Sequence, residues 1–410
     1  MNKKFYENFA IVLTISFLVV LVYHCKNPEK ESDYFSPKAL ATHFNGENYV
    51  GSETCMECHA DIYADHLKTA HFNTSAPATE KTVLGNFAAG SNILDIEQAR
   101  FTLERKADSL YQYTEIKNRN VKIAPSTFDI VIGSGVRGQS YATWQNNQLF
   151  QLQTSYHTPS DSWVNSPGFP FFVWQDRPVR DACLKCHVTF ATNLDFSGHG
   201  NRYDKEKIIY GVDCEKCHRP SEKHVVYHRE NPEIATAKFM LSLDSISRQQ
   251  RLDVCAQCHS GSRDQLLKGN SFSFLSGEIL DEYARNSYKG KPSEKLDVHG
   301  NQYGLLTRSK CFEQSPTMDC VTCHNPHKNQ RGNTAYFNQK CMSCHSGRTP
   351  ICSVEASKME TIGNNCIACH MPVTPSDAMK VQLKRSDSEE TSFYIRSHLI
   401  GIYENNLDTD

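Results

Sequence analysis

The first clear pattern of apolar and polar residues lies at the start of the chain. An almost unbroken apolar run extends from Phe9 to Tyr23, and Lys3 and Lys4 precede it. A basic start followed by about 15 apolar residues is typical of a secretory signal peptide, and it is short for a membrane-spanning helix of about 20 residues. We therefore predict a signal peptide over residues 1–24.

Cys25, just after this run, suggests how the exported chain is attached to a membrane. Cys25 stands where a bacterial lipoprotein is cleaved and lipidated, and lipidation holds a protein at a membrane surface. His24 departs from the usual pattern, which has a small residue before the cysteine. We predict lipidation of Cys25 and a polar tether over residues 25–48. An uncleaved membrane anchor and cleavage at another residue are the alternatives.

Two further patterns predict regular structure. After Cys55–His59, the residues Ile62, Tyr63, His66, Leu67 and Ala70 follow one another at a spacing that fits a helix. Residues 97–165 instead hold short, partly alternating apolar runs separated by turn signals such as Gly133-Ser-Gly135 and Asn146-Asn147. This pattern predicts a small antiparallel β insert of four or five strands.

One motif recurs along the rest of the chain. It is C-x-x-C-H, in which two cysteines bind the vinyl groups of a porphyrin and the adjacent histidine reaches the iron. The seven copies are Cys55, Cys58 and His59; Cys183, Cys186 and His187; Cys214, Cys217 and His218; Cys255, Cys258 and His259; Cys320, Cys323 and His324; Cys341, Cys344 and His345; and Cys366, Cys369 and His370. We predict seven covalently bound c-type haems, with these seven histidines as proximal ligands of the iron.

Composition agrees with a chain that is built around its cofactors. The motifs contain 14 of the 17 cysteines, so these cysteines do not form a disulfide framework. The 410 residues provide about 59 residues for each haem, and hydrophobic residues make up only 39% of the chain. The formal charge is −2, and no long basic run indicates a nucleic-acid partner.

These observations predict the fold and the domain boundaries. We expect a mainly α fold with extensive coil, organised by stacked haems, with the β insert added. Residues 49–96 form a first haem segment, residues 97–165 the insert, residues 166–375 a core with six haems, and residues 376–410 a C-terminal segment. We interpret the aromatic stretch Trp163–Pro178 as a loop that packs on a haem.

Histidines outside the motifs are candidates for the distal position of each iron. Of 18 histidines, seven are proximal, and His24 and His43 lie in or beside the N-terminal leader. The nine that remain are His66, His71, His157, His199, His224, His228, His299, His327 and His398. His71, which follows the predicted helix, is favoured over His66. His224 and His327 each lie shortly after a motif and past a proline, so we expect them to serve a neighbouring iron.

Two cysteines have no place in a motif. Cys311 and Cys352 would form a disulfide in an oxidising compartment, or they remain buried thiols.

The chain resembles bacterial multihaem c-type cytochromes, and more distantly the hydroxylamine oxidoreductase and pentahaem nitrite reductase superfamily. The segments that carry the resemblance are Tyr49–His59 with Thr69-Ala-His71, Ile132–Gly135, Trp163–Gly168, Gly211–His218, Cys255–Gly261, Asp297–Asn301 and Cys320–His327. The resemblance implies that His71, His224, His299 and His327 are distal ligands, and His398 completes our candidate set. All seven motifs end in histidine, whereas the catalytic haem of nitrite reductase uses C-x-x-C-K, so the resemblance implies the cofactors rather than a reaction.

Two functions fit this pattern. The first is electron transfer along the haems in a respiratory chain, with mostly bis-histidine irons and with redox proteins of the periplasm or membrane as partners. The second is a terminal oxidoreductase in which one open iron acts on a small nitrogen or sulfur compound. The surplus of histidines favours the first function, and the large insert keeps the second open.

Overall fold

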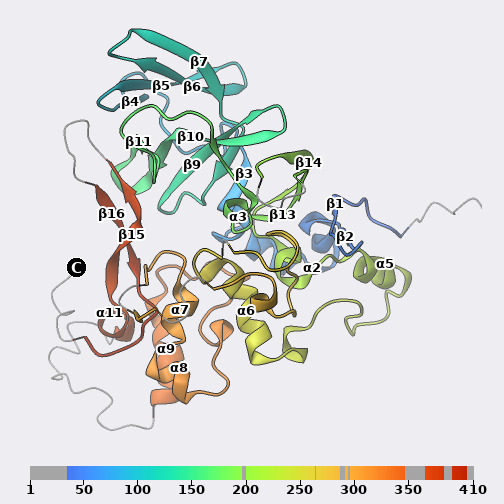
Figure 1. Cartoon of the computed structure of the whole chain (residues 1–410). Coiled ribbons are helices and arrows are strands. Elements are labelled where there is room, and N and C mark those ends of the chain that lie inside the picture. Colours follow the sequence, from blue (N-terminus) through green and yellow to red (C-terminus); the bar gives the residue numbers. More distant parts are fainter. Residues whose placement is uncertain are drawn as a thin grey trace, which may run out of the picture.

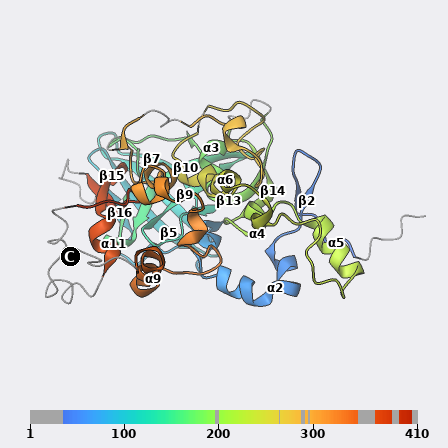
Figure 2. The same cartoon turned by 90° about the horizontal axis from the view of Figure 1, so that it is seen from below.

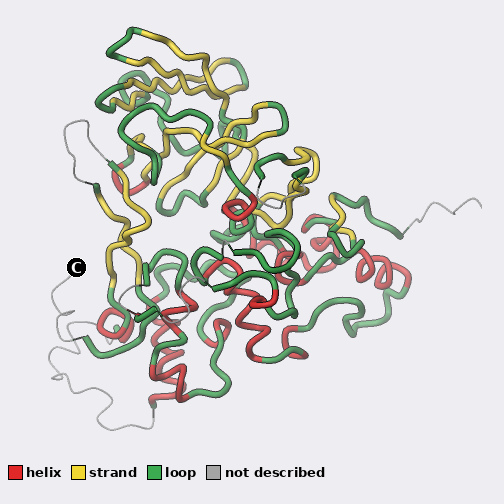
Figure 3. The backbone as a smooth tube through the Cα atoms, in the orientation of Figure 1, coloured by secondary structure: helices red, strands yellow, loops and turns green. Residues whose placement is uncertain are grey.

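The computed structural model describes residues 35–195, 200–263, 265–286, 291–293, 296–346, 365–382 and 390–403. Strands gather in the upper part of the molecule and helices in the lower part, and a long hairpin of β15 and β16 stands at one side (Figure 1). The tube in Figure 3 shows the same division, with long loops between the helices. The predicted signal peptide and Cys25 lie outside the described residues.

The prediction of a mainly α fold is wrong. The structure is 26% helical and 28% strand, with several antiparallel sheets. One reason is that an attachment motif needs little more than one helical turn, as in α4 (Cys214–His218). The other is that strands form beyond residues 97–165, in places where β-branched and aromatic residues gather.

Two antiparallel sheets make up the upper part. In the first sheet the strand order is β11-β10-β9-β8-β3, and β12 pairs with β10. Its strands are β3 (Ser75–Pro77), β8 (Ile130–Ile132), β9 (Gly138–Gln145), β10 (Gln148–His157), β11 (Ser162–Asn165) and β12 (Arg177–Pro178). The second sheet has the order β4-β5-β6-β7, with β4 (Ile93–Asp95), β5 (Ala99–Lys106), β6 (Ser109–Ile116) and β7 (Val121–Thr127). Residues 97–165 therefore hold seven strands rather than four or five.

A shared apolar core joins these two sheets. Phe101 and Leu103 of β5 are buried against Tyr141 of β9 and Leu152 of β10. Trp163, at the start of the stretch that we interpreted as a loop on a haem, lies in β11 and packs in this core. Its ring contacts Phe87, Phe128, Tyr141 and Tyr156. Burial of these large rings supplies the main stabilisation of the upper part.

A second core connects the sheets to the helical part. The hairpin of β13 (Val188–Asn193) and β14 (Tyr203–Tyr210) packs its buried residues, including Phe190 and Tyr203, against Ile130 and Leu149 of the first sheet. Tyr49 of the short pair β1 (Ala41–Thr42) and β2 (Asn48–Tyr49) stacks on Phe190, with ring centroids 4.7 Å apart. Because β13 directly follows Cys183–His187, this core fixes that motif to the sheet.

The helices are short and spread across the lower face. Seen from below, they extend from α5 and α2 on one side to α11 on the other (Figure 2). They are α2 (Ser52–His66), α3 (Asp181–Leu184), α4, α5 (Glu222–Glu230), α6 (Arg248–His259), α7 (Gln302–Leu306), α8 (Lys310–Gln314), α9 (Thr334–His345) and α11 (Cys366–His370). The 3-10 turns are η1 (Phe72–Thr74), η2 (Thr158–Ser160), η3 (Leu243–Ser245), η4 (Leu280–Glu282) and η6 (Cys320–Thr322). The hairpin at the side consists of β15 (Val373–Val381) and β16 (Thr391–Arg396).

Candidate haem sites

Each attachment motif lies on or beside a helical turn. We number the sites 1 to 7 in chain order, from Cys55–His59 to Cys366–His370. Sites 1, 3, 4, 6 and 7 lie within α2, α4, α6, α9 and α11, while α3 and η6 carry the start of sites 2 and 5. The predicted helix after Cys55 is confirmed as α2, although its backbone is kinked at His59. In a helical turn the two cysteines of C-x-x-C and the following histidine lie on one side, as a haem requires.

Side-chain caps set where several of these turns begin. The Asp213 carboxylate accepts a hydrogen bond from Cys214 N at 2.8 Å, and Asn365 Oδ1 accepts one from Ala368 N at 3.3 Å. Ser247 and Gln250 form a reciprocal capping box at the start of α6. Because these caps satisfy the free N–H groups of the first turn, they fix the register of the cysteines that follow.

Three pairs of imidazoles have the separation that a shared iron requires. An imidazole nitrogen lies about 2 Å from a metal, so two rings on opposite sides of one iron have centroids about 6 Å apart. The observed separations are 6.1 Å for His71 and His259, 6.0 Å for His218 and His327, and 6.1 Å for His324 and His398. Each pair joins a motif histidine with one of the predicted distal histidines. These residues therefore fit a bis-histidine haem at sites 4, 3 and 5.

Two further predicted distal histidines lie within electrostatic range of motif histidines. His299 interacts with His187 of site 2 and with His259 of site 4. His224 interacts with His59 of site 1 and with His218 of site 3. Of the five candidates, all of which lie in the described residues, only His71, His327 and His398 pair with the motif histidine of one particular site, and in each case it is not the site that immediately precedes them in the chain.

Hydrogen bonds hold several of these rings by one nitrogen. Gln302 Oε1 lies 3.1 Å from His259 Nδ1, and the backbone carbonyl of Lys238 lies 2.7 Å from His224 Nδ1. Thr74 Oγ1 lies 3.0 Å from His187 Nδ1. A hydrogen bond at Nδ1 fixes the orientation of the ring and leaves Nε2 for a metal, which is the usual arrangement of metal-ligating histidines.

Sites 6 and 7 differ from the others in the part of the chain that the structure describes. Gly401 O lies 2.7 Å from His370 Nδ1 and orients this motif histidine as described above. His345 is exposed at the end of α9. Within residues 35–195, 200–263 and the other described ranges, no second imidazole pairs with His345 or His370.

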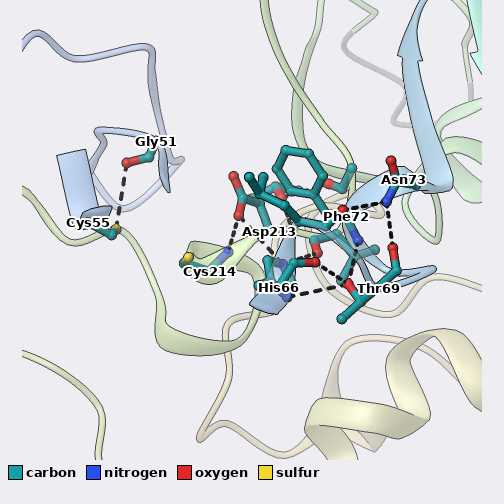
Figure 4. Close-up of polar contacts among 12 residues, drawn as sticks. Gly51, Cys55, His66, Thr69, Phe72, Asn73, Asp213 and Cys214 are labelled. Carbon is teal, nitrogen blue, oxygen red and sulfur yellow. Dashed lines mark hydrogen bonds and ion pairs between the residues drawn. The ribbon is translucent and has the colours of Figure 1, made fainter. Parts of the chain in front are cut away.

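Other histidines use their ring nitrogens for protein contacts. His66 Nε2 lies 3.2 Å from Val212 O and 3.6 Å from Asp213 Oδ1, and Thr69 Oγ1 approaches its other nitrogen (Figure 4). His228 Nε2 accepts a hydrogen bond from Lys238 N at 3.2 Å. His43 is held at both nitrogens, by Asn45 and by Phe272 O. His66 and His228 thus use ring nitrogens for contacts within the protein, and the preference for His71 over His66 stays a prediction.

Partial burial favours the neutral form of the candidate ligands, although His71, His299 and His324 remain exposed residues in the structure. It lowers the pKa of His71, His187 and His398 to about 4, and a neighbouring histidine adds to the effect in each case. Burial also lowers the pKa of His218, His299, His324 and His327. Neutral imidazole is the form that binds a metal, so these environments favour ligation at neutral pH.

These lowered pKa values predict acid sensitivity. Between the unfolded pKa of about 6.5 and the folded value, the unfolded chain binds more protons than the folded chain. The stability that these neutral imidazoles contribute is therefore complete above about pH 6.5 and is lost as the pH falls, so the protein should be less stable at pH 5 than at pH 7. Iron ligation acts in the same direction, because it also requires neutral imidazole. Guanidinium unfolding of the haem-loaded protein at the two pH values measures this loss, and equal midpoints would contradict it.

Gly211 and Val212, between β14 and site 3, hold the backbone around the candidate ligand His71. Val212 N donates to His71 O at 2.8 Å, and Gly211 N donates to Ser75 Oγ at 2.9 Å. Gly211 has a φ of 70°, and a Cβ on it would lie 2.2 Å from Phe72 O. Only glycine permits both this conformation and this close approach. The glycine of Gly211-Val-Asp-Cys thus brings site 3 against the segment that carries His71.

Glu215, between the two cysteines of site 3, connects three segments. Its buried carboxylate accepts hydrogen bonds from Gly51 N at 2.8 Å, from Val50 N, and from both N and Oγ of Ser221 at 2.8 and 2.7 Å. Burial raises the pKa of Glu215, while these donors counteract that rise. Val50 and Gly51 lead into α2 with site 1, and Ser221 precedes α5 with His224. Nothing in the local sequence identifies this role, because the partners are distant in the chain.

Cysteines of different motifs also lie close together. Cys55 interacts with Cys214, Cys186 with Cys258, Cys255 with Cys320, and Cys341 with Cys366. Phe337 of α9 contacts the ring of His324, with centroids 5.3 Å apart. These contacts connect sites 1 and 3, 2 and 4, 4 and 5, 6 and 7, and 5 and 6. Cys217 of site 3 also interacts electrostatically with Cys255 of site 4. This contact joins sites 1 and 3 to the others, so the seven motifs form one contiguous group.

Two other predictions concern residues that the structure does not describe. Cys352, the predicted disulfide partner of Cys311, lies outside the described residues, and so does His199. Among the helices of the described part, none has the length and apolar character needed to cross a bilayer.

Comparisons with known proteins agree with this class of site. Residues 138–219, which include sites 2 and 3, match the family described as cytochrome c554 and c-prime. The fold is similar to the crystal structure of the outer cell wall cytochrome OcwA, with a TM-score of 0.55 and 18% sequence identity over 86% of this chain and 79% of that chain. No curated protein sequence matches the chain.

The arrangement of the C-x-x-C-H motifs and of the histidines around them fits covalent attachment of haem. The two comparisons support a c-type cytochrome, and a cytochrome of this type carries covalently bound haem and transfers electrons.

Proposed function

We propose that the chain is an exported cytochrome with seven covalently bound c-type haems, and that it transfers electrons along them in a respiratory chain. The observation that carries this proposal is the set of three imidazole pairs with centroids 6.0–6.1 Å apart. Bis-histidine ligation saturates an iron and suits it to electron transfer. When bound, the haems would supply the one-electron chemistry of their irons.

The chain's own residues would hold and orient each iron. His59, His187, His218, His259, His324, His345 and His370 are the proposed proximal ligands. The proposed distal ligands are His224 at site 1, His299 at site 2, His327 at site 3, His71 at site 4 and His398 at site 5. Hydrogen bonds to Nδ1 and the apolar surroundings of these rings would then adjust the reduction potentials.

The contacts between motifs support a continuous route for electrons. Contacts between cysteines link sites 1 to 5, and His71 and His327 each add a link between two of these sites. The helix α9 then connects site 5 with sites 6 and 7. The similar structure is described as an outer cell wall cytochrome, which supports an exported location for this chain. We infer that the partners are redox proteins of the periplasm or membrane, and that lipidation of Cys25 would keep the protein at a membrane surface.

The number of histidines that already contact other parts of the protein favours a second candidate function, a terminal oxidoreductase with an open iron. His43, His66 and His228 use ring nitrogens in protein contacts. Fewer imidazoles are therefore left for sites 6 and 7 than the sequence alone offers. In this case a small nitrogen or sulfur compound such as nitrite or hydroxylamine would bind at one of these two irons.

Two measurements on the purified protein test the proposal. A pyridine haemochrome assay should give about seven haems for each chain, and a much lower number would refute the proposed count. Electron paramagnetic resonance of the oxidised protein should be dominated by low-spin signals. A high-spin signal that shifts when nitrite or hydroxylamine is added would instead establish the second candidate.

A further inference from the structure

The C-terminal hairpin of β15 and β16 reaches two of the haem sites. The segment that follows β16 carries His398, which pairs with His324 of site 5, and Gly401, whose carbonyl holds His370 of site 7. The buried hydroxyl of Ser309 fixes this segment, because it donates to His398 O at 3.0 Å and accepts from Ile400 N at 2.8 Å. The hairpin and Ser309 together hold the segment that places His398 beside His324.

The pairing of β15 with β16 is irregular at one point, where some backbone N–H groups find no acceptor within the two described strands. The register of β15 against β16 shifts between Pro375 and Lys380. At such a bulge, the backbone N–H groups of the inserted residues lose their partners across the ladder. Unpaired N–H groups are costly, so an acceptor from outside the hairpin is expected at residues 376–379.

Asp297 supplies that acceptor. Its Oδ1 accepts from Ser376 Oγ at 2.8 Å, and its Oδ2 accepts from Asp377 N and from Ala378 N, the latter at 2.9 Å. Ser376 is fully buried, whereas the two backbone N–H groups that donate to Oδ2 lie on the exposed side of the bulge. Hydrogen bonds to a carboxylate are about twice as strong as bonds between neutral groups.

The same carboxylate also holds the segment of a second haem site. Asp297 Oδ1 accepts from His299 N at 2.7 Å, and His299 is the candidate ligand beside His187 of site 2. Three residues further on, Gln302 orients His259 of site 4. One side chain thus connects the loop that serves sites 2 and 4 with the hairpin that serves sites 5 and 7.

We propose that Asp297 is a positioning residue that couples the distal ligand of site 2 to the distal ligand of site 5 through the bulge of the C-terminal hairpin. This inference rests on the proposed ligation by His299 and His398. Release of the carboxylate would free the bulge, and the segment of His398 would then leave its iron more often. A bis-histidine iron binds an added ligand such as cyanide only after its distal histidine has left, so the rate of cyanide binding reports this opening.

The test compares two Asp→Asn variants of the haem-loaded full chain. The Asp297 carboxylate accepts four hydrogen bonds, two at each oxygen. Asp297→Asn replaces Oδ2 with an N–H₂ group and so removes the two bonds from the backbone N–H groups of the bulge. Asp377→Asn is the matched control, because its exposed side chain pairs only with Lys380 across one turn. We expect cyanide to bind at least about tenfold faster to Asp297→Asn than to the unaltered protein, and at an unchanged rate to Asp377→Asn.

Further variants identify the iron and protect the test against misfolding. The fast phase of cyanide binding in Asp297→Asn should show the same change in haem absorbance as the new phase in His398→Ala. Added imidazole should slow this phase, because it competes with cyanide for the open iron. If Asp297→Asn does not accumulate with haem, Ser376→Ala removes a single bond to the carboxylate and should still accelerate cyanide binding severalfold. Unchanged rates in the variants that load haem would overturn the coupling by Asp297. Ligation by His398 itself would be refuted separately, by a His398→Ala protein that stays fully low-spin.

Discussion

Replacement of His327 by alanine is expected to convert one iron of the oxidised protein from low spin to high spin. His327 lies 6.0 Å from His218 of site 3, with the two ring planes only 8° apart, and its segment follows site 5. Without this imidazole, the iron of site 3 would keep His218 alone, and a five-coordinate or water-bound ferric haem is high-spin. Electron paramagnetic resonance with spin quantitation should show about one new high-spin iron for each chain.

The control for this variant is His157→Ala. The ring of His157 packs on Phe393 at 4.9 Å, and its Nδ1 contacts Ser160, so its loss should leave every iron unchanged. Added imidazole should restore the low-spin signal in His327→Ala and have no effect in the control. A His327→Ala protein with the spectrum of the unaltered protein would exclude His327 as a ligand.

Among the substitutions that we propose, replacement of Glu215 by alanine should cause the largest decrease in the free energy of unfolding. The change leaves the backbone N–H groups of Val50, Gly51 and Ser221 buried without their acceptor. Each such donor costs about 1–3 kcal/mol, so we expect a decrease of roughly 4–6 kcal/mol in the free energy of unfolding. Guanidinium unfolding of the haem-loaded protein, followed by circular dichroism, measures the change.

Glu222→Ala provides the comparison for Glu215→Ala. Glu222 is a neighbouring carboxylate that accepts one hydrogen bond, from Asn48 Nδ2 at 2.9 Å, in a partly exposed position. Its loss should cost about 1 kcal/mol or less. Similar midpoints for the two variants would mean that the contacts of Glu215 are not essential to the fold.

The sequence predicts the chemistry of this protein better than its architecture. A haem attachment motif is local, so five consecutive residues identify each site. Candidate distal ligands such as His327 are also local signals, because a histidine three residues after a motif and past a proline cannot turn back to its own iron. What the sequence does not contain is the partner of each candidate, which the fold alone supplies.

The sequence pattern underestimates the strands, because attachment motifs are its strongest signal in residues 166–375. Residues 188–193 and 203–210 have the β-branched and aromatic residues of a hairpin, yet they lie between two attachment sites of the six-haem core. Glu215 and Asp297 escape prediction for a different reason. A buried carboxylate is recognised by the backbone donors around it, and these donors come from distant segments such as Val50 and Ala378.

The exchange of imidazoles between sites has a consequence for biogenesis. His71 lies near site 1 in the chain but faces His259, and His327 follows site 5 but faces His218. In the function that we propose, no short segment of the exported chain would contain both imidazoles of such a pair. Thioether attachment would then have to be compatible with irons that hold only one protein ligand, and the second ligand would arrive when remote parts of the chain meet. The change from high to low spin would then report the final step of maturation.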